Sequence, residues 1–558
     1  MEKQNRSEND VTAKLFPDSA ERHYKYPLLG FLILSLLIFY VYYPSFKFDF
    51  IYDDFVVIKK QQSLTGIHDV VRIFQERHYP TLPYYRPVVR TTLLLQKTIY
   101  GDNPAPFHQF NTFLLWIAAI CVYWLLRQPQ INMPRLLAFM ISGIFALHPV
   151  VSASVYPIAS GRETLLPGIF MILTMISYFK KGKIWYIWTL VFFTVALFGK
   201  EQAVMLLPLF VIGDLAGMKD DPSRRKISYW LKRYAPMAII LLIYMQIRFS
   251  LFEGTEFSPT IFNEPLKPLL TPLYALQSIF APFYDEVYEP RHAKIWLSIP
   301  RLVIAMLSVF ALSCGIYKYA DQGRSLFIFW GSWFVLSVLP TANVIVQEAA
   351  FSERYVLQSY LALLMICAFI LAQIWRKKRV RPFMIIIGIV VMMILANFTM
   401  NRGNFFIGEV EFYKQWIRVN PDHPDSYLVL SEIYLQKGDI DQALHYSSKA
   451  FTLKPDYIPA LEHMAIILGE KGEFEKAVEY FHRALALNPN VANTRLNFGV
   501  FYFRNKKYEL AIREFKKCLE LDPSNPVIYY NLSLVYESMN QKLLAEEYYR
   551  KGYSLSLK

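Results

Sequence analysis

Residues 383–399 read FMIIIGIVVMMILANFT, and the character of the chain changes within a few residues of this stretch. The stretch is uncharged and close to the length, about 20 residues, that a helix needs to cross the apolar core of a bilayer. From about residue 405 the chain becomes polar and carries both signs of charge. The sequence therefore predicts an all-α protein in which a polytopic membrane helix bundle precedes a soluble helical part.

Apolar runs of similar length recur throughout the chain before this stretch. Of the 558 residues, 54% are hydrophobic and only 19% are charged, which is unusual for a soluble globular protein. The predicted spans lie near 27–45, 107–126, 136–157, 163–179, 184–199, 201–217, 235–252, 297–317, 326–346, 356–375 and 383–399. They amount to about eleven spans. Residues 257–296, rich in Pro and aromatic residues, form either an amphipathic segment in the lumen or a further helical hairpin, which would not change the sidedness of the chain ends.

The net charge of +14 comes largely from basic clusters between the apolar runs. These clusters are Lys180, Lys181 and Lys183; Arg224, Arg225, Lys226, Lys232 and Arg233; and Arg376, Lys377, Lys378, Arg379 and Arg381. Such placement is typical of cytoplasmic loops rather than of nucleic-acid binding. It predicts a cytoplasmic tail over residues 1–26, without a cleavable signal peptide. An odd number of spans then places the C-terminal part outside the cytoplasm, in a lumen or periplasm.

The polar C-terminal part is a repeat array with a period of 34 residues. Prolines recur at positions 421, 455, 489 and 523, and alanines at 443, 477, 511 and 545. This period is typical of tetratricopeptide repeats, which are helix pairs that present a concave face to peptides. Repeats are predicted near 424–457, 458–491, 492–525 and 526–558, within a domain over 403–558. Asp439 and Asp441 lie at a repeat turn, so they are predicted to cap a helix rather than to bind metal.

Polar residues gather at the predicted outer ends of the membrane helices. Two carboxylates, Asp53 and Asp54, lie in the stretch FDFIYDDFV over residues 48–56. The other candidates are Arg86, His108, Asn111, His148, Arg162, Glu163, Lys200, Glu201, Glu353 and Arg354. Charged groups in or near a membrane usually have a partner or a task. Their accumulation on one side predicts an active site at the outer membrane surface.

Several of these motifs resemble those of one family, in the same order along the chain. They are Tyr85-Arg86-Pro87, His108-x-x-Asn111, FALHPV at 145–150, GRETLL at 161–166, Lys200-Glu201, LPTAN at 339–343 and Glu353-Arg354-Tyr355. Together with the repeats they resemble the transmembrane and tetratricopeptide repeat (TMTC) proteins. Ala153 departs from the family pattern, which has Glu at this position. This departure leaves any role of that carboxylate in doubt for this chain.

The resemblance implies a GT-C-type glycosyltransferase domain over residues 27–402. Family members are O-mannosyltransferases that pass a sugar from a polyprenyl-phosphate carrier to Ser or Thr hydroxyls of extracytoplasmic proteins. In such inverting chemistry Asp53 or Asp54 would be the base, and the resemblance favours Asp53 weakly. Arg86, Arg162, Lys200 and Arg354 would bind the phosphate, and the repeats would bind the acceptor protein. No cofactor is required, although the two carboxylates leave a divalent metal open.

Structural roles are the alternative for each of these residues. Asp53 and Asp54 could cap the helical segment that follows them. His148 precedes a proline at a turn, His108 and Asn111 could tie helix ends together, and Glu353 could form an internal ion pair. For the whole protein, a non-enzymatic membrane scaffold would explain the spans and repeats but not the polar residues on one face. A transporter would place its polar residues near the bilayer midplane.

Overall fold

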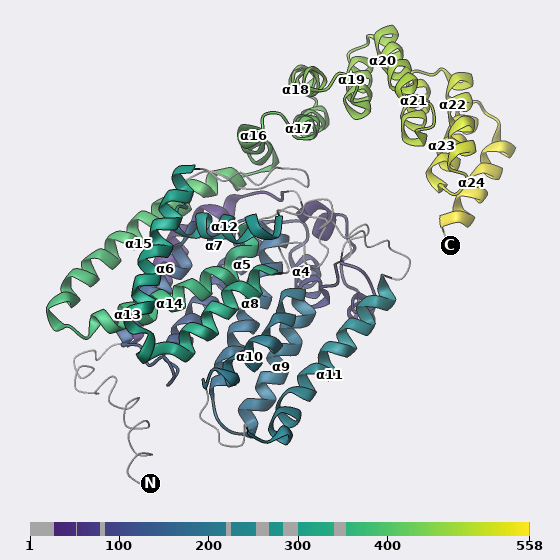
Figure 1. Cartoon of the computed structure of the whole chain (residues 1–558). Helices are drawn as coiled ribbons and strands as arrows, with labels where there is room; N and C mark the ends of the chain where they lie inside the picture. The colour runs from purple at the N-terminus through teal and green to yellow at the C-terminus, as the bar shows by residue number, and fades with distance from the viewer. Residues whose placement is uncertain are drawn as a thin grey trace, which may run out of the picture. The chain divides into compact units, whose positions relative to one another are not determined.

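The computed structural model describes residues 27–51, 53–78, 84–218, 225–252, 267–282, 299–339 and 353–556. The chain divides into two compact units, Met1–Phe412 and Tyr413–Lys558, here called the membrane unit and the repeat unit. All regular elements among the described residues are helices, which confirms the predicted fold class (Figure 1). The predicted N-terminal tail, most of LPTAN, and residues 257–266 and 283–296 lie outside the described residues, whereas 267–282 contain the helix α12 (Lys267–Phe280).

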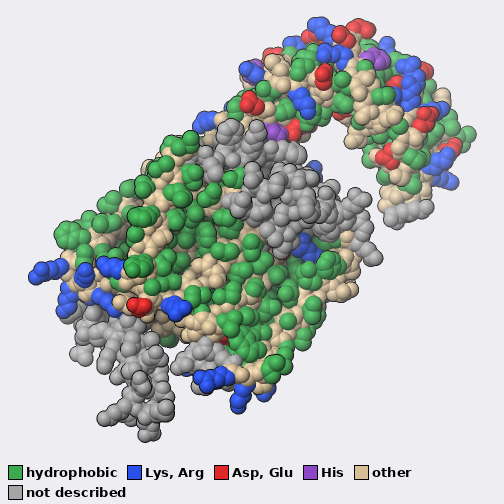
Figure 2. All heavy atoms as spheres, in the orientation of Figure 1, with side chains coloured by type: hydrophobic (Ala, Val, Ile, Leu, Met, Phe, Trp, Pro, Cys, Tyr) green, Lys and Arg blue, Asp and Glu red, His purple; other side chains and the backbone are tan. Residues whose placement is uncertain are grey.

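In the membrane unit, α14 packs mainly against α13 and also contacts α6, α8 and α12. The unit contains α2 (Pro27–Tyr42), η2 (Tyr43–Lys47), η3 (Phe55–Lys59), α3 (Ile67–Ile73), α4 (Pro87–Tyr100), α5 (Ala105–Leu126), α6 (Arg135–Leu147), α7 (Pro149–Ser152), α8 (Ile158–Phe179), α9 (Lys183–Gly199), η4 (Glu201–Met205), α10 (Leu206–Leu215), α11 (Ile227–Leu251), α12 (Lys267–Phe280), α13 (Ile299–Val338), η8 (Glu353–Val356), α14 (Leu357–Trp375), η9 (Lys378–Val380), α15 (Arg381–Gly403) and η10 (Asn404–Phe406). α14 is apolar on all sides and 83% buried, whereas α15 is only 22% buried. An apolar helix with so much exposed surface is suited to contact with lipid. Figure 2 shows hydrophobic side chains over much of the visible face of this unit.

Six helices in the described part of the chain are long and apolar enough to cross a membrane, so the predicted count of eleven is not confirmed. The runs near 297–317 and 326–346 meet in α13, whose backbone leaves helical geometry at Tyr319 and Gly323. A straight helix of its 40 residues would be about 60 Å long, twice the apolar thickness of a bilayer. The kink divides it into two segments. The runs near 136–157, 184–199 and 201–217 form the shorter helices α6, α9 and α10.

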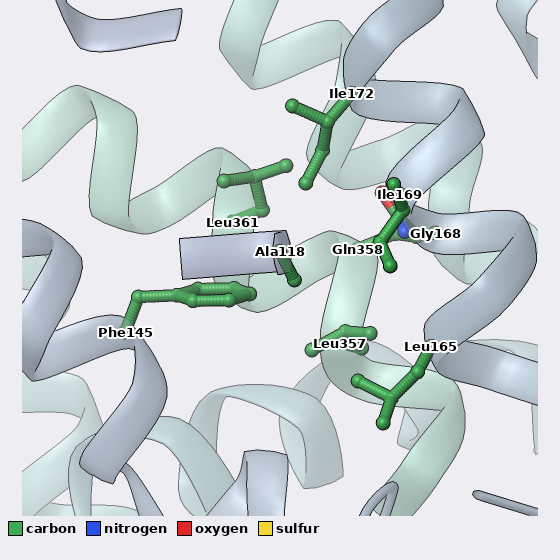
Figure 3. Close-up of a pocket in the computed structure, with 9 residues that line it drawn as sticks. All are labelled: Ala118, Phe145, Leu165, Gly168, Ile169, Ile172, Leu357, Gln358 and Leu361. Atoms are coloured by element: carbon green, nitrogen blue, oxygen red, sulfur yellow. The ribbon is translucent and has the colours of Figure 1, made fainter. Parts of the chain in front are cut away.

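A narrow apolar gap, too small to hold a water molecule, lies where α5, α6, α8 and α14 meet (Figure 3). Ala118 and Gly168 leave this space because their side chains are small, and Phe145 faces it from α6. Gln358 is the one polar side chain among its lining residues. The space lies among packed helices and contains none of the candidate catalytic residues, so it does not mark the site.

The repeat unit confirms the predicted array. After α16 (Glu409–Val419) come four antiparallel helix pairs, each formed by neighbours in sequence. They are α17 (Pro424–Gln436) with α18 (Ile440–Leu453), α19 (Ile458–Glu470) with α20 (Phe474–Leu487), α21 (Ala492–Arg504) with α22 (Tyr508–Leu521), and α23 (Pro526–Ser538) with α24 (Lys542–Ser556). Asp439 caps α18 by accepting from the Gln442 amide at 3.1 Å, as the sequence predicts.

The small residue near the middle of each first helix lets the second helix approach. A Cβ on Gly499 would come within 2.5 Å of the Phe515 ring. At the equivalent positions the Ser431 hydroxyl donates to the Ala443 carbonyl at 2.8 Å, and the Ser533 hydroxyl donates to the Ala545 carbonyl at 2.7 Å. The repeated pattern therefore has a packing reason: anything larger would separate the paired helices.

Candidate active site

Asp54 is a buried helix cap, but not of the segment that follows it. Its side chain accepts from the Ala159 amide at 2.7 Å and from the Ile51 amide at 3.0 Å. Ala159 is the second residue of α8, where backbone N–H groups have no partner within the helix. The capping alternative thus describes Asp54 well, although the capped helix begins about a hundred residues later. η3, which directly follows Asp54, receives no bond from this side chain.

Burial raises the pKa of Asp54 from its ordinary value to about 7. The amides of Ala159 and Ile51 oppose this shift, while the neighbouring charge of Asp53 adds to it. A pKa near neutrality is useful for a base. However, both oxygens of Asp54 already accept backbone amides, and the residue is only 1% exposed. Geometry therefore assigns Asp54 to structure rather than to substrate.

The raised pKa predicts how stability depends on pH. The folded protein binds the proton of the Asp54 carboxyl more tightly than the unfolded chain does. The contribution of this proton to the free energy of unfolding is therefore fully present below about pH 4 and is lost as pH rises through about 7. Asp54→Asn removes the titration. Thermal midpoints are measured in detergent at pH 5 and pH 8. We expect the midpoint of Asp54→Asn, relative to that of wild type, to be higher at pH 8 than at pH 5. A difference that is the same at both pH values would contradict the raised pKa.

Asp53 is the open member of the pair. Its side chain is 18% exposed, and its Oδ2 atom lies 3.9 Å from Nη1 of Arg354. Arg354 lies in η8, which precedes α14. Two segments about three hundred residues apart thus bring a carboxylate and a guanidinium together, as the predicted outer-surface site requires.

Lys200 and Arg354 share an aromatic neighbour. The Lys200 Nζ atom lies 5.0 Å from the centre of the Tyr355 ring, and the Arg354 guanidinium lies 5.3 Å from the same ring. Lys200 also donates to Oγ1 of Thr164 at 3.0 Å. Cations over an aromatic face are attracted by its quadrupole. The sequence did not single out Tyr355 as a site residue; the available signal was its place after Arg354 in the Glu353-Arg354-Tyr355 motif.

Arg86 is held by two carboxylates. It binds Glu201 in a bidentate manner, at 3.2 Å from Nε and 2.6 Å from Nη2, and its Nη1 pairs with Glu163. His78, which sequence reasoning missed, contacts Glu163 at 2.7 Å. All four side chains are buried. The structure therefore brings Arg86, Glu163 and Glu201 together, but as an internal network in which the charge of Arg86 is already balanced.

Three further candidates tie helix ends together. Asn111 donates to the carbonyls of Val155, Pro157 and Ile158 ahead of α8. The amide oxygen of Asn111 accepts from Nε of Arg162 at 3.2 Å. Arg162 is fully buried and lies 4.7 Å from the centre of the Phe110 ring. The neighbouring His108 packs edge-on against Phe48, with ring centres 5.9 Å apart. These contacts favour the structural alternative for Asn111 and Arg162.

His148 and Glu353 also have internal contacts. His148 caps α7 by accepting from the Val150 amide at 3.2 Å, so its other ring nitrogen carries the proton and donates to the Ile279 carbonyl at 3.0 Å. Glu353 pairs with Arg402 in the last turn of α15 rather than with its neighbour Arg354. Arg402 was missed because its partner is 49 residues away in the sequence. The only signal for it was a basic residue directly after an apolar run.

The donor set fits a metal poorly. Within the described ranges, no three His, Cys, Asp or Glu side chains gather in an arrangement that could hold an ion. Each oxygen of Asp54 already accepts a backbone amide. Ala153, where the family pattern has Glu, is buried in the turn after α7.

Comparisons with known proteins address the family resemblance of the chain. Over 458 residues the chain is 22% identical to Protein O-mannosyl-transferase F38B6.6 of Caenorhabditis elegans, covering 76% of this chain and 63% of the worm protein. The chain resembles the protein O-mannosyl-transferases. It is 26% identical to TMTC2 of Mus musculus, in a match that covers 34% of this chain and 24% of the mouse protein. It is 25% identical to Tmtc3 of Drosophila melanogaster, in a match that covers 27% of this chain and 19% of the fly protein. The TMTC resemblance predicted from the sequence is confirmed, although the chain spans less than two thirds of the length of each of these relatives.

The repeats are matched separately. The family described as "Tetratricopeptide repeat" matches residues 424–457, 459–491 and 526–558, and that described as "TPR repeat" matches residues 501–540. Among solved structures, one described as MamA is 22% identical over 26% of this chain and 86% of its own, with a TM-score of 0.23. Another, described as PilF of Pseudomonas aeruginosa, is 30% identical over 24% of this chain and 60% of its own, with a TM-score of 0.22.

Proposed function

We propose that this protein is an inverting GT-C-type membrane glycosyltransferase. It would move a sugar, most simply mannose, from a polyprenyl-phosphate carrier to Ser or Thr hydroxyls of extracytoplasmic proteins. The observation that carries the proposal is the carboxylate of Asp53, which is partly exposed (18%) and lies 3.9 Å from Arg354. The similarity to proteins named protein O-mannosyl-transferases supports the choice of reaction.

In this reaction Asp53 is the general base. It takes the proton of the acceptor hydroxyl, whose oxygen then attacks the anomeric carbon of the sugar while the bond from that carbon to the phosphate oxygen breaks. The configuration at the anomeric carbon inverts because attack and departure occur on opposite faces. The leaving polyprenyl phosphate gains one negative charge. Cations near the phosphate therefore stabilise the transition state more than the ground state.

Lys200 and Arg354 are the cations best placed for the leaving phosphate. Arg162 is enclosed by helix ends, and Arg86 is already balanced by Glu163 and Glu201. Arg354 faces Asp53 on one side and shares the Tyr355 ring with Lys200. A donor phosphate would compete with Asp53 for Arg354. Donor binding would thus weaken the ion pair between Arg354 and Asp53, the proposed base.

The two units would bind different substrates of the reaction. The membrane unit binds the lipid donor, and the repeats bind the acceptor protein along their concave face. This division requires the N-terminus in the cytoplasm and the repeats outside it, at the endoplasmic reticulum or a prokaryotic plasma membrane.

The proposal is tested with purified protein, radiolabelled polyprenyl-phosphate mannose and a Ser/Thr-rich peptide. Label on the peptide, absent when Ser and Thr are replaced by Ala, would support the transferase. The repeats on their own favour a second candidate, a non-enzymatic scaffold that gathers extracytoplasmic proteins. Binding of extracytoplasmic proteins without transfer from any polyprenyl-phosphate sugar would favour that candidate instead.

Lys200→Gln and Arg354→Gln are expected to impair use of the donor. Loss of a charge-assisted hydrogen bond to phosphate costs about 1.5–3 kcal/mol, or roughly one to two decades in kcat/KM for the donor. Lys97→Gln is a matched control, because Lys97 is a buried lysine whose partners are the Ile58 and Lys59 carbonyls and Asp102, none of which is a candidate site residue. Its donor KM should stay at the wild-type value. A change confined to the acceptor KM in the Lys200 and Arg354 variants would argue against phosphate binding.

A further inference from the structure

A basic surface lies at the opposite end of α8 from the candidate site. The 22 residues of α8 extend about 33 Å, roughly the apolar thickness of a bilayer. At its far end the turn into α9 and the start of α11 carry six basic side chains that the proposed reaction does not use. They are Lys180, Lys181, Lys183, Arg225, Lys226 and Lys232. All but Lys180 are exposed. We call these six residues the basic rim.

The two segments of the rim are fastened to each other. The hydroxyl of Tyr186 in α9 donates to the carbonyls of Arg233 at 2.8 Å and Lys232 at 3.2 Å in α11. The Lys232 carbonyl is available because Pro236, four residues later, has no N–H to donate to it. A break in the hydrogen bonding of α11 is thus filled from α9, so the lysines of the two segments keep a defined spacing.

The nearby acidic group does not cancel this charge. Asp214 is fully buried and pairs with Arg233 at 2.9 Å. It also accepts from the hydroxyls of Tyr178, Tyr229 and Tyr234. Arg233 therefore balances Asp214 inside the protein, so Asp214 does not neutralise the six side chains of the rim.

Exposed apolar side chains border the rim. On α9 they are Ile184 (59% exposed), Ile187 (45%) and Trp188 (43%), and on α11 they are Ile227 (78%) and Leu231 (59%). Lys180 lies 3.6 Å from the centre of the Trp185 ring, which joins the charged and apolar parts. Figure 2 shows the corresponding pattern on the visible face, with Lys and Arg at the lower end of an apolar surface. This combination matches the boundary between lipid head groups and acyl chains.

We propose that the basic rim and the adjoining faces of α9 and α11 form a binding site for an anionic phospholipid. The phosphate head group lies against the rim lysines and arginine, and the acyl chains lie along Ile184, Trp188 and Leu231. The exposed apolar residues select a lipid over a free phosphate, because a soluble anion would leave them without a partner. The bound lipid would fasten α11 to α9 from outside, as Tyr186 does from within.

A second basic cluster in the same protein provides the control. The turn between α14 and α15 carries Arg376, Lys377, Lys378, Arg379 and Arg381, comparable charge on a single segment. Arg381 uses its Nε to bind the Trp375 carbonyl at 2.9 Å. If charge alone attracted lipid, both clusters would bind equally. We expect the basic rim to bind lipid more tightly than the cluster between α14 and α15, because its two helices are held together by Tyr186.

The test compares two triple variants of the full chain in detergent. Phosphatidylglycerol and phosphatidylcholine are titrated, and bound lipid is counted by native mass spectrometry. Each Lys or Arg near an anionic surface contributes about fivefold to binding. K181Q/K183Q/K226Q is therefore expected to lower phosphatidylglycerol affinity on the order of 100-fold. K377Q/K378Q/R379Q should retain the affinity of the wild type, and phosphatidylcholine should bind weakly to all three.

Tyr186→Phe is a second variant that keeps every charge. It is expected to weaken phosphatidylglycerol binding several-fold while its elution in size exclusion stays that of wild type. Equal losses in the two triple variants, no loss in either, or an unchanged Tyr186→Phe would overturn the site. Displacement of the lipid by glycerol phosphate at equal concentration would overturn the assignment to a lipid.

Discussion

Asp53→Asn is expected to lower kcat about 10²–10⁴-fold, the usual contribution of a general base. Asn has nearly the size of Asp but no basic oxygen, so the acceptor hydroxyl keeps its proton at the moment of attack. Donor binding should persist, since Lys200 and Arg354 remain in place. The measurement is single-turnover transfer of labelled sugar to a Ser/Thr peptide, with donor affinity determined separately.

Asp54→Asn is the matched control for this prediction, because it makes the same chemical change one residue away. Asp54 is 1% exposed and bonded to two amides, so its loss should affect stability more than the chemical step. A reversed order, with Asp54→Asn inactive and Asp53→Asn near wild type in kcat, would transfer the role of base to Asp54. Near-normal kcat in both variants would make the pair structural.

Arg86→Met is expected to give the largest loss of stability. Breaking a buried ion pair by removing one partner costs about 3–5 kcal/mol, because a charge is left buried without compensation. Here two carboxylates, Glu163 and Glu201, lose their shared partner at once. The thermal midpoint of the full chain in detergent measures the effect. The exposed Arg72, whose ion pairs lie at the surface, is the control, and Arg72→Met should change the free energy of unfolding by less than about 1 kcal/mol.

The buried network also predicts non-additivity. Replacing Glu163 and Glu201 by Gln in the Arg86→Met background removes the uncompensated charges, so part of the lost stability should return. If the triple variant is less stable than Arg86→Met by the sum of the separate losses, the three groups do not form one network.

Much of the fold was predictable because it is encoded locally. Four prolines 34 residues apart are enough to place each helix pair, since every repeat packs mainly on its neighbours. The apolar runs likewise predicted where membrane helices lie. Their number was less predictable, because hydropathy does not show that two runs join in one kinked helix at Tyr319 and Gly323, or that α10 is short.

Most residues of the candidate site could be predicted from the sequence, but their hydrogen-bond partners could not. Polar residues at helix ends indicated a region where the structure brings several of them together, yet the sequence cannot reveal which of them bond to unpaired backbone groups at other helix ends. Asn111 serves three carbonyls, and Asp54 serves an amide of α8. Both partnerships depend on tertiary placement. The sequence therefore could not separate Asp53 from Asp54, whereas burial and hydrogen bonding do.

The cap that Asp54 places on α8 also limits how the first loop can vary. One peptide unit separates this anchor from Asp53, so the proposed base and the first turn of α8 move as one body. Residues could be added near Lys60, which is exposed, without shifting that body. An insertion between Ile51 and Asp54 would instead pull the carboxylate out of the helix end. Natural variation in loop length should therefore fall after residue 59 and spare the residues immediately before it.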